Sequence, residues 1–171
     1  MIGDVAAPSD RGPDPLLRTA GIDDLPELLR LARDFYDEDG FATTDAELRS
    51  NFRALLADEA SARICLAVGD DSAIGFALTT SRVILESGIV AELQDLYVMP
   101  AQRHRGIGAG LVNDAIRWAK TVRASVLEVV VAPNGRDVSQ LFAYYAARGF
   151  RDEGRRLLAL VLGSAARQGL R

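Results

Sequence analysis

The chain has 171 residues, of which 49% are hydrophobic and 26% are charged, a composition typical of one soluble globular domain. Its 24 acidic and 20 basic residues leave a net charge of −4, so a general affinity for nucleic acid is not expected. Cys65 is the only cysteine and His104 the only histidine, which excludes an intramolecular disulfide and argues against a metal site.

The two ends of the chain have a different composition from the middle. Residues 1–15 are rich in Pro, Gly and Asp and lack the basic and apolar regions of a secretory signal. We expect a disordered leader at 1–15, a folded domain at 16–162 and a frayed tail at 163–171. No apolar run approaches the roughly 20 residues that span a bilayer, so a cytoplasmic protein without a membrane partner is predicted.

The first half of the chain predicts one strand, two helices and a hairpin. A short strand is expected at 16–20. Apolar residues at helical spacing then predict helices over 21–39, where Asp23 or Asp24 can cap the start, and over 44–58. Strands are expected at 62–69 and 73–84, joined by the turn residues Gly-Asp-Asp-Ser.

The second half predicts alternating strands and helices. A strand at 89–100 ends at a proline, and a helix of about four turns follows over 107–122. The apolar, β-branched run at 125–133 predicts a strand buried on both faces. A helix at 137–150 and a strand at 155–163 complete a single-domain α/β fold with a mixed sheet.

The loop "RHRGIGAG" (103–110) places three basic residues and three glycines where a strand meets a helix. The first turn of a helix has unpaired N–H groups and a partial positive charge, so it binds anions. The loop has neither the Lys-Ser/Thr of a P-loop nor the spacing of a dinucleotide-binding fold. Two interpretations stay open: a tight turn with solvated arginines, or a binding site for a diphosphate.

A family resemblance favours the second interpretation. "RHRGIG" resembles the Arg/Gln-x-x-Gly-x-Gly/Ala signature of the GNAT superfamily of acetyl-CoA-dependent N-acetyltransferases. "LQDLYVMP" before it and "FAYYAARGF" near the end are similar to that family's flanking patterns, and the central strand is most similar to polyamine-type acetyltransferases. The resemblance implies a mostly antiparallel mixed sheet flanked by about four helices, acetyl-CoA as co-substrate without a metal, and a possible homodimer.

The resemblance also implies which residues bind acetyl-CoA. The backbone of Leu96, Tyr97 and Val98 would pair with the pantetheine arm, and the Val98 N–H would donate a hydrogen bond to the thioester carbonyl. Arg103 would add positive charge. The pyrophosphate would be held by the backbone N–H groups of the loop residues His104, Arg105, Gly106, Ile107, Gly108 and Ala109.

One family position differs in this chain. Relatives often carry an asparagine seven residues before the tyrosine of the last motif, where it contacts the pantetheine arm. Val138 occupies that position here, and Asn134 lies four residues earlier. Either Asn134 reaches the cofactor from a longer loop, or the contact is lost.

The transfer reaction needs a base for the amine and an acid for the leaving thiolate. Tyr145 matches the family tyrosine four residues before a glycine, although it also fits an apolar helix stripe, and Tyr144 is the neighbouring alternative. Gln94 stands where polyamine-type relatives have a glutamate. Glu92 and Asp95 are therefore the candidate bases; they face opposite sides of a regular strand, although a bulge would change that.

The acceptor is less defined by the sequence. The acidic stretch "DFYDEDG" (34–40) either selects a cationic amine or is a solvated helix end. The main prediction is transfer of acetyl to a primary amine of a small molecule in a ternary complex. Aminoglycosides and peptide or protein amines remain alternatives, as does a catalytically weak acyl-CoA-binding sensor, which Gln94 and Val138 would suggest.

Overall fold

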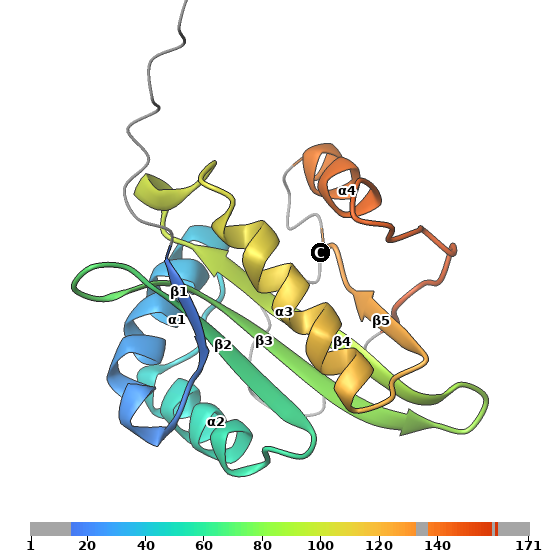
Figure 1. Cartoon of the computed structure of the whole chain (residues 1–171), viewed down its shortest axis with the longest axis horizontal. Helices are drawn as coiled ribbons and strands as arrows, with labels where there is room; N and C mark the ends of the chain where they lie inside the picture. Colours follow the sequence, from blue (N-terminus) through green and yellow to red (C-terminus); the bar gives the residue numbers. More distant parts are fainter. Residues whose placement is uncertain (1–14, 133–136, 159, 161–171) are drawn as a thin grey trace, which may run out of the picture.

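The computed structural model describes residues 15–132, 137–158 and 160. A five-stranded sheet runs through it in the order of the chain. The first four strands pair antiparallel and the fifth pairs parallel to the fourth, so the predicted mixed, mostly antiparallel sheet is confirmed (Figure 1). The strands are β1 (Leu16–Thr19), β2 (Ala62–Val68), β3 (Ala73–Ile84), β4 (Gly88–Val98) and β5 (Val126–Val129).

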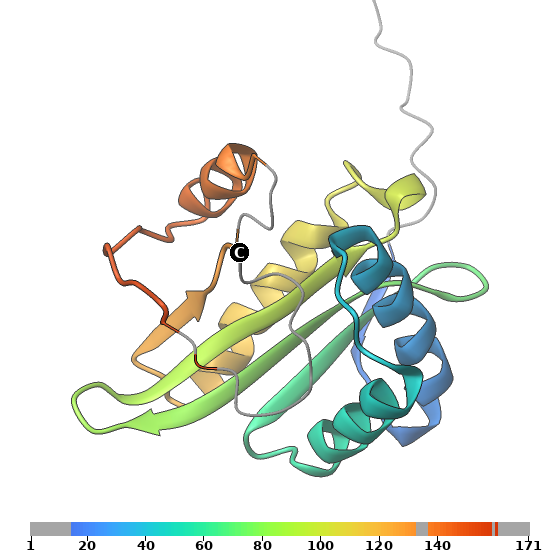
Figure 2. The ribbon, with the colours of Figure 1, turned by 180° about the vertical axis from the view of Figure 1, so that it is seen from behind.

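Helices cover both faces of this sheet. Figures 1 and 2 show α1 (Leu25–Asp39) and α2 (Asp45–Ala57) on one face and α3 (Ile107–Thr121) on the other. The short helix α4 (Ser139–Ala146) lies beyond β5, near the end of the described chain. Two single-turn 3₁₀ helices, η1 (Ile22–Asp24) and η2 (Pro100–Gln102), precede α1 and α3 respectively.

Local sequence signals explain where the helices begin. Thr44 and Glu47 form a reciprocal capping box at the start of α2. Asp24 occupies the N-cap of α1 as predicted, but its side chain does not cap the helix. Instead the Asp24 carboxylate accepts hydrogen bonds from both terminal nitrogens of Arg18, at 2.7 and 2.6 Å, because β1 passes beside it.

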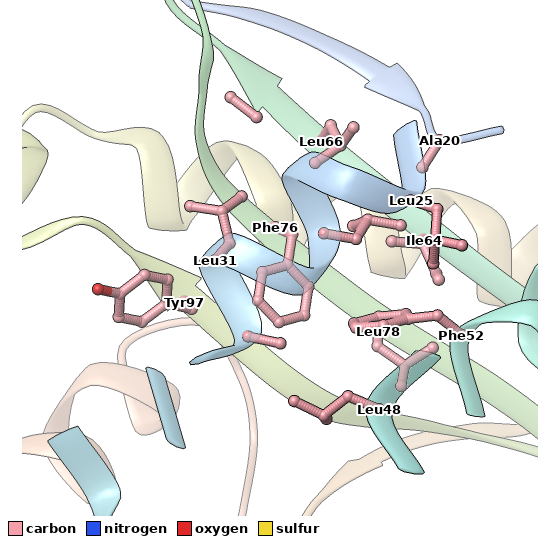
Figure 3. Packing of buried hydrophobic residues seen from close by; sticks show 13 residues of the cluster. Ala20, Leu25, Leu31, Leu48, Phe52, Ile64, Leu66, Phe76, Leu78 and Tyr97 are labelled. Atoms are coloured by element: carbon pink, nitrogen blue, oxygen red, sulfur yellow. The ribbon is translucent and has the colours of Figure 1, made fainter. Parts of the chain in front are cut away.

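The apolar core has two parts, one on each face of the sheet. Under α1 and α2, Leu31 and Phe52 pack on Phe76 of β3, and Tyr97 of β4 closes one end of this cluster (Figure 3). On the other face, Leu111 and Val112 of α3 pack against Leu93. The faces of α1, α2 and α3 that 3.6-residue periodicity predicts are therefore the buried ones.

One buried charge on α3 was not predicted. Asp114 is only 6% exposed, and it accepts hydrogen bonds from Nε and Nη2 of Arg63 on β2 at 2.7 and 3.0 Å. Arg117, one turn later, also pairs with it at 3.2 Å. This pairing satisfies the carboxylate between α3 and the sheet, as a buried charge requires.

Two predictions for the C-terminal third were wrong. The strand expected at 125–133 is only four residues long and is not buried on both faces, since Val126 and the adjacent Val130 are 45% and 54% exposed. Within the described residues β5 pairs only with β4 and forms the sheet edge, which leaves one side uncovered. Residues 155–158 and 160 form neither helix nor strand, and the rest of the predicted last strand lies outside the described ranges.

Candidate active site

The second half of β4 is paired on one side only. Its pairing with β5 ends at Leu93, opposite Val129, whereas its pairing with β3 continues to Val98, opposite Gly75. In the part of the chain that the structure describes, residues 94–98 therefore have no strand partner on the β5 side. A free strand edge can pair with an extended ligand in the same way as with another strand.

A bulge lies where the β5 pairing stops. Asp95 pairs with Leu78 and Leu93 pairs with the next residue, Thr79, so Gln94 is an extra residue in β4. A bulge reverses the alternation of side chains beyond it. Leu93 lies in the core under α3, whereas Tyr97 lies in the core under α1. Asp95 and Glu92 therefore lie on the same sheet face, in contrast to the parity of a regular strand.

The Val98 N–H group points away from β3. The N–H of the next residue, Met99, donates to the Ile74 carbonyl of β3 at 3.0 Å. Along a strand, the N–H and C=O groups of successive residues point to opposite sides. Since the Met99 N–H points to β3, the N–H and C=O of Val98 point to the unpaired side of β4. The Val98 carbonyl there accepts a hydrogen bond from Nε of Arg103 at 2.9 Å.

The glycine loop forms the N-terminus of α3 beside this strand edge. Gly106 is its N-cap, with φ of 83°, a left-handed conformation that favours glycine. The first intrahelical bond runs from the Gly110 N–H to the Gly106 carbonyl at 3.0 Å, so the N–H groups of the three residues between them have no partner within the helix. A Cβ on Gly108 would lie 4.0 Å from Cγ2 of Val98, so the helix start and the strand edge are adjacent.

The three basic side chains of the loop have different environments. Arg103 forms a bidentate ion pair with Glu38 at the end of α1, at 2.9 and 2.6 Å. The side chain of Arg105 donates to that of Gln102. His104 is exposed and adopts a positive φ of 63°. Glu38 was not predicted individually, because nothing in the sequence relates residue 38 to residue 103.

The two candidate bases differ in their partners. Glu92 pairs with Arg82 of β3 at 2.6 Å. Asp95 is partly buried, and that burial, together with the negative charges of Asp39 and Glu92, raises its pKa to about 6. A carboxyl group with such a pKa is ionised at neutral pH but holds a transferred proton more readily than an ordinary aspartate. Perturbed groups of this kind cluster at functional sites.

The two adjacent tyrosines of α4 both lie in the core under α3. Tyr145 is 9% exposed, its ring packs against Phe150, and burial raises its pKa to about 12. The Tyr144 hydroxyl is buried without a hydrogen-bond partner in the described structure, and a Cβ on Gly108 would lie 3.1 Å from it. The Tyr144 hydroxyl thus lies at the start of α3.

These features together fit a ligand with a diphosphate and an extended amide-containing arm. The unpaired N–H groups at the start of α3 suit the diphosphate, and the β4 edge suits the arm. Asn134 lies outside the described residues, so its contact with such a ligand stays a prediction. Asp95 lies at the start of this unpaired half of β4, and Glu92 lies just before the bulge, in the half that pairs with β5.

Comparisons with known proteins agree with this geometry. Residues 25–150 match the model of the acetyltransferase (GNAT) family. An uncharacterized N-acetyltransferase of Archaeoglobus fulgidus is 30% identical over 139 residues, which cover 79% of this chain and 92% of that protein. Aminoglycoside N(6′)-acetyltransferase type 1 of Klebsiella aerogenes is 30% identical over 109 residues, or 62% of this chain and 71% of that protein.

A solved structure supports the same fold. The aminoglycoside N-acetyltransferase AAC(6′)-Iy in complex with CoA superposes with a TM-score of 0.77 at 20% identity, covering 90% of this chain and 99% of that one. Because the family model spans most of the chain and the match to the Archaeoglobus relative covers 79% of this chain and 92% of that protein, the chain belongs to the GNAT family and is an acetyl-CoA-dependent N-acetyltransferase.

Proposed function

We propose that this enzyme transfers the acetyl group of acetyl-CoA directly to a primary amine of a small molecule, with both substrates bound at once. The main supporting observation is the one-sided edge of β4 at 94–98, which leads through the glycine loop into α3. The buried Cys65, whose pKa burial raises to about 12, is a poor nucleophile. Direct transfer requires no covalent intermediate on the protein.

The backbone supplies most of the contacts to acetyl-CoA in this proposal. The N–H groups of the loop from His104 to Ala109 hold the pyrophosphate, and glycines at 106 and 108 keep side chains away from it. Leu96, Tyr97 and Val98 pair with the pantetheine arm, and Asn134 is a further candidate contact. The outward direction of the Val98 peptide supports this arrangement.

The Val98 N–H stabilises the oxyanion that forms when the amine nitrogen attacks the thioester carbonyl. A donor of this kind contributes about 3 kcal/mol to transition-state stabilisation. A new C–N bond forms and the C–S bond breaks. The amine nitrogen therefore loses protons, and the sulfur leaves as a thiolate that takes up a proton.

Asp95 is the proposed base. Its pKa of about 6 and its place on the unpaired half of β4 support proton removal from the amine, directly or through a water molecule. Glu92 is engaged with Arg82, so we assign it a supporting role, in which its charge attracts a cationic acceptor. The proton on the leaving sulfur comes from Tyr145, whose high pKa keeps the hydroxyl protonated until the thiolate forms.

The acceptor is proposed to be a cationic amine. The negative charges of Asp39 and Glu92 act on Asp95, and a local field of this sign attracts an ammonium group. The Klebsiella relative, an aminoglycoside N(6′)-acetyltransferase by name, makes an aminoglycoside amine the first specific candidate. A cytoplasmic location and a homodimer remain predictions of the same proposal.

A thiol-release assay tests the proposed function. Purified enzyme and acetyl-CoA are mixed with polyamines, aminoglycosides, amino acids and lysine peptides, and free CoA thiol is measured. Turnover with a small amine that falls on Tyr145→Phe substitution, while acetyl-CoA affinity is retained, is the expected result. Binding of acetyl-CoA without thiol release for any amine would instead identify a sensor, and turnover only with peptides would reassign the acceptor.

A further inference from the structure

Arg103, the first residue of the glycine-loop motif, makes three kinds of contact away from the helix N-terminus. Its terminal nitrogens form the bidentate pair with Glu38 of α1 at 2.9 and 2.6 Å. Its Nε donates to the Val98 carbonyl at 2.9 Å. Its guanidinium carbon lies 5.8 Å from the centre of the Tyr97 ring, within the range of a cation–π contact.

These contacts join the end of helix α1 to the end of strand β4. Glu38 belongs to the last turn of α1, where the helix dipole disfavours carboxylates, so a paired cation there is favourable. Tyr97, under the guanidinium, also packs against Phe35 of α1 with ring centres 5.5 Å apart. The end of α1 and the end of β4 therefore meet at Arg103.

The geometry also limits what else the guanidinium can do. The planar fork of Arg103 is already matched to a carboxylate, and Nε is used by a carbonyl. To bind a phosphate with the same nitrogens, the Arg103 side chain would have to break its ion pair with Glu38 and rotate away from β4. The ion pair is partly exposed, so it adds little to the free energy of folding. Its main effect is to fix the position of the Arg103 side chain.

We propose that Arg103 is a positioning residue that fixes the Val98 peptide against the end of α1, and that it is not a phosphate ligand. The inference rests on the proposed function in one respect, since the Val98 N–H of that same peptide is the proposed oxyanion donor. Arg103 thereby links the acidic helix end on the acceptor side to the strand edge that holds the acetyl donor. Acetyl transfer then depends on Glu38, which acts through Arg103.

A double-mutant cycle with Glu38→Gln and Arg103→Met tests this assignment. We expect each variant to lower kcat about tenfold, the double variant to be no slower than either single one, and the Kd of acetyl-CoA by calorimetry to change less than threefold. Arg103→Lys, which can pair with Glu38 but lacks the fork, should recover only part of kcat. Asp24→Asn is the matched control, because it removes a similar bidentate arginine pair at Arg18, remote in sequence from the loop.

The alternative, that Arg103 binds phosphate, predicts different effects of the two substitutions on acetyl-CoA affinity. If Arg103 binds phosphate, Arg103→Met weakens acetyl-CoA binding more than tenfold, and Glu38→Gln strengthens it by releasing the guanidinium. Either of those results, or an unchanged kcat in both single variants, would overturn the proposal.

A second readout separates this proposal from the proposed function. Amide hydrogen exchange at residues 96–103 should become faster in both variants but not in Asp24→Asn, whether or not the protein turns over any amine. If the wild-type protein has no activity but exchange responds in this way, the proposed function fails and the positioning role stands. Unchanged exchange in an active enzyme rejects the positioning role alone.

Discussion

The two halves of β4 belong to one strand but have different surroundings. From Val90 to Leu93 the strand pairs with both β3 and β5, whereas from Asp95 to Val98 it pairs only with β3 among the described residues. The bulge at Gln94 lies at the boundary. Glu92, in the first half, is held by Arg82, while Asp95, in the second half, has a pKa raised to about 6 by burial and neighbouring carboxylates.

This difference separates the residues with a structural role from the proposed site residues along the eleven positions of β4. In the doubly paired half, backbone groups are satisfied and charges are neutralised by ion pairs. In the singly paired half, the backbone can bind a ligand and one carboxyl group remains perturbed. The following predictions break or sharpen this contrast, from the largest expected effect on activity to the smallest.

Gly106→Val should abolish measurable acetyl-CoA binding, a loss of at least about 100-fold in affinity. Valine at φ of 83° strains the N-cap of α3 and places a branched side chain at the proposed pyrophosphate. Calorimetry with acetyl-CoA measures the loss.

Gly88→Val is the matched control for this substitution. Gly88 has a similar φ of 72° and, like Gly106, open space around its missing Cβ, but it begins β4 at the hairpin end. It should lose similar stability and keep acetyl-CoA affinity. If both variants bound acetyl-CoA equally well, the glycine loop would not be part of the acetyl-CoA site.

Asp95→Asn should lower kcat about 100- to 1000-fold, because the amine loses its proposed base. Glu92→Gln, in the paired half of β4, should change kcat less than tenfold. Initial rates with a fixed acceptor compare the two. A larger effect at Glu92 would exchange the roles of the two carboxylates.

The same Asp95 variant has a pH-dependent effect on stability. The folded-state pKa of about 6 is above the ordinary value of 3.8, so the native state holds this proton more tightly than the unfolded state. The stabilising contribution is complete below about pH 4 and is lost as pH rises through 6. Asp95→Asn should therefore raise the free energy of unfolding at pH 8 by up to about 3 kcal/mol and leave it nearly unchanged at pH 4, as measured by urea denaturation.

Tyr145→Phe should lower kcat about 10- to 100-fold with little change in the KM of acetyl-CoA, since the leaving thiolate loses its acid. Tyr144→Phe is the neighbouring test. Its buried hydroxyl lies at the start of α3, so its removal should change the KM of acetyl-CoA rather than kcat. Exchange of these two signatures would make Tyr144 the acid.

Arg63→Met should have the smallest effect on activity. Among the described ion pairs, it leaves the buried Asp114 carboxylate with the more exposed Arg117 alone, which should cost about 2–4 kcal/mol of stability. The kinetic constants at a temperature where the variant is folded should be unchanged. A large fall in kcat would show that the α3 face of the sheet affects the reaction.

Much of the fold followed from periodicity and turn chemistry in the sequence. The buried faces of α1, α2 and α3 and the hairpin turn after Val68 agree with prediction because each depends on residues a few positions apart. The exposed β5 was not predicted, because an apolar run does not show whether a further strand covers it. The ion pairs Arg63–Asp114 and Arg103–Glu38 join residues 51 and 65 positions apart, for which one sequence contains no signal.

The sequence by itself determined the family, the donor and the positions of the loop and flanking motifs, because these are contiguous stretches whose backbone conformation depends on local residues such as Gly106. Only the tertiary structure decided which carboxylate of β4 is perturbed and what Arg103 contacts. The bulge at Gln94 and the approach of α1 to the end of β4 determine the surroundings of these side chains. Burial and charge are sums over neighbours from the whole chain, and packing alone brings those neighbours together.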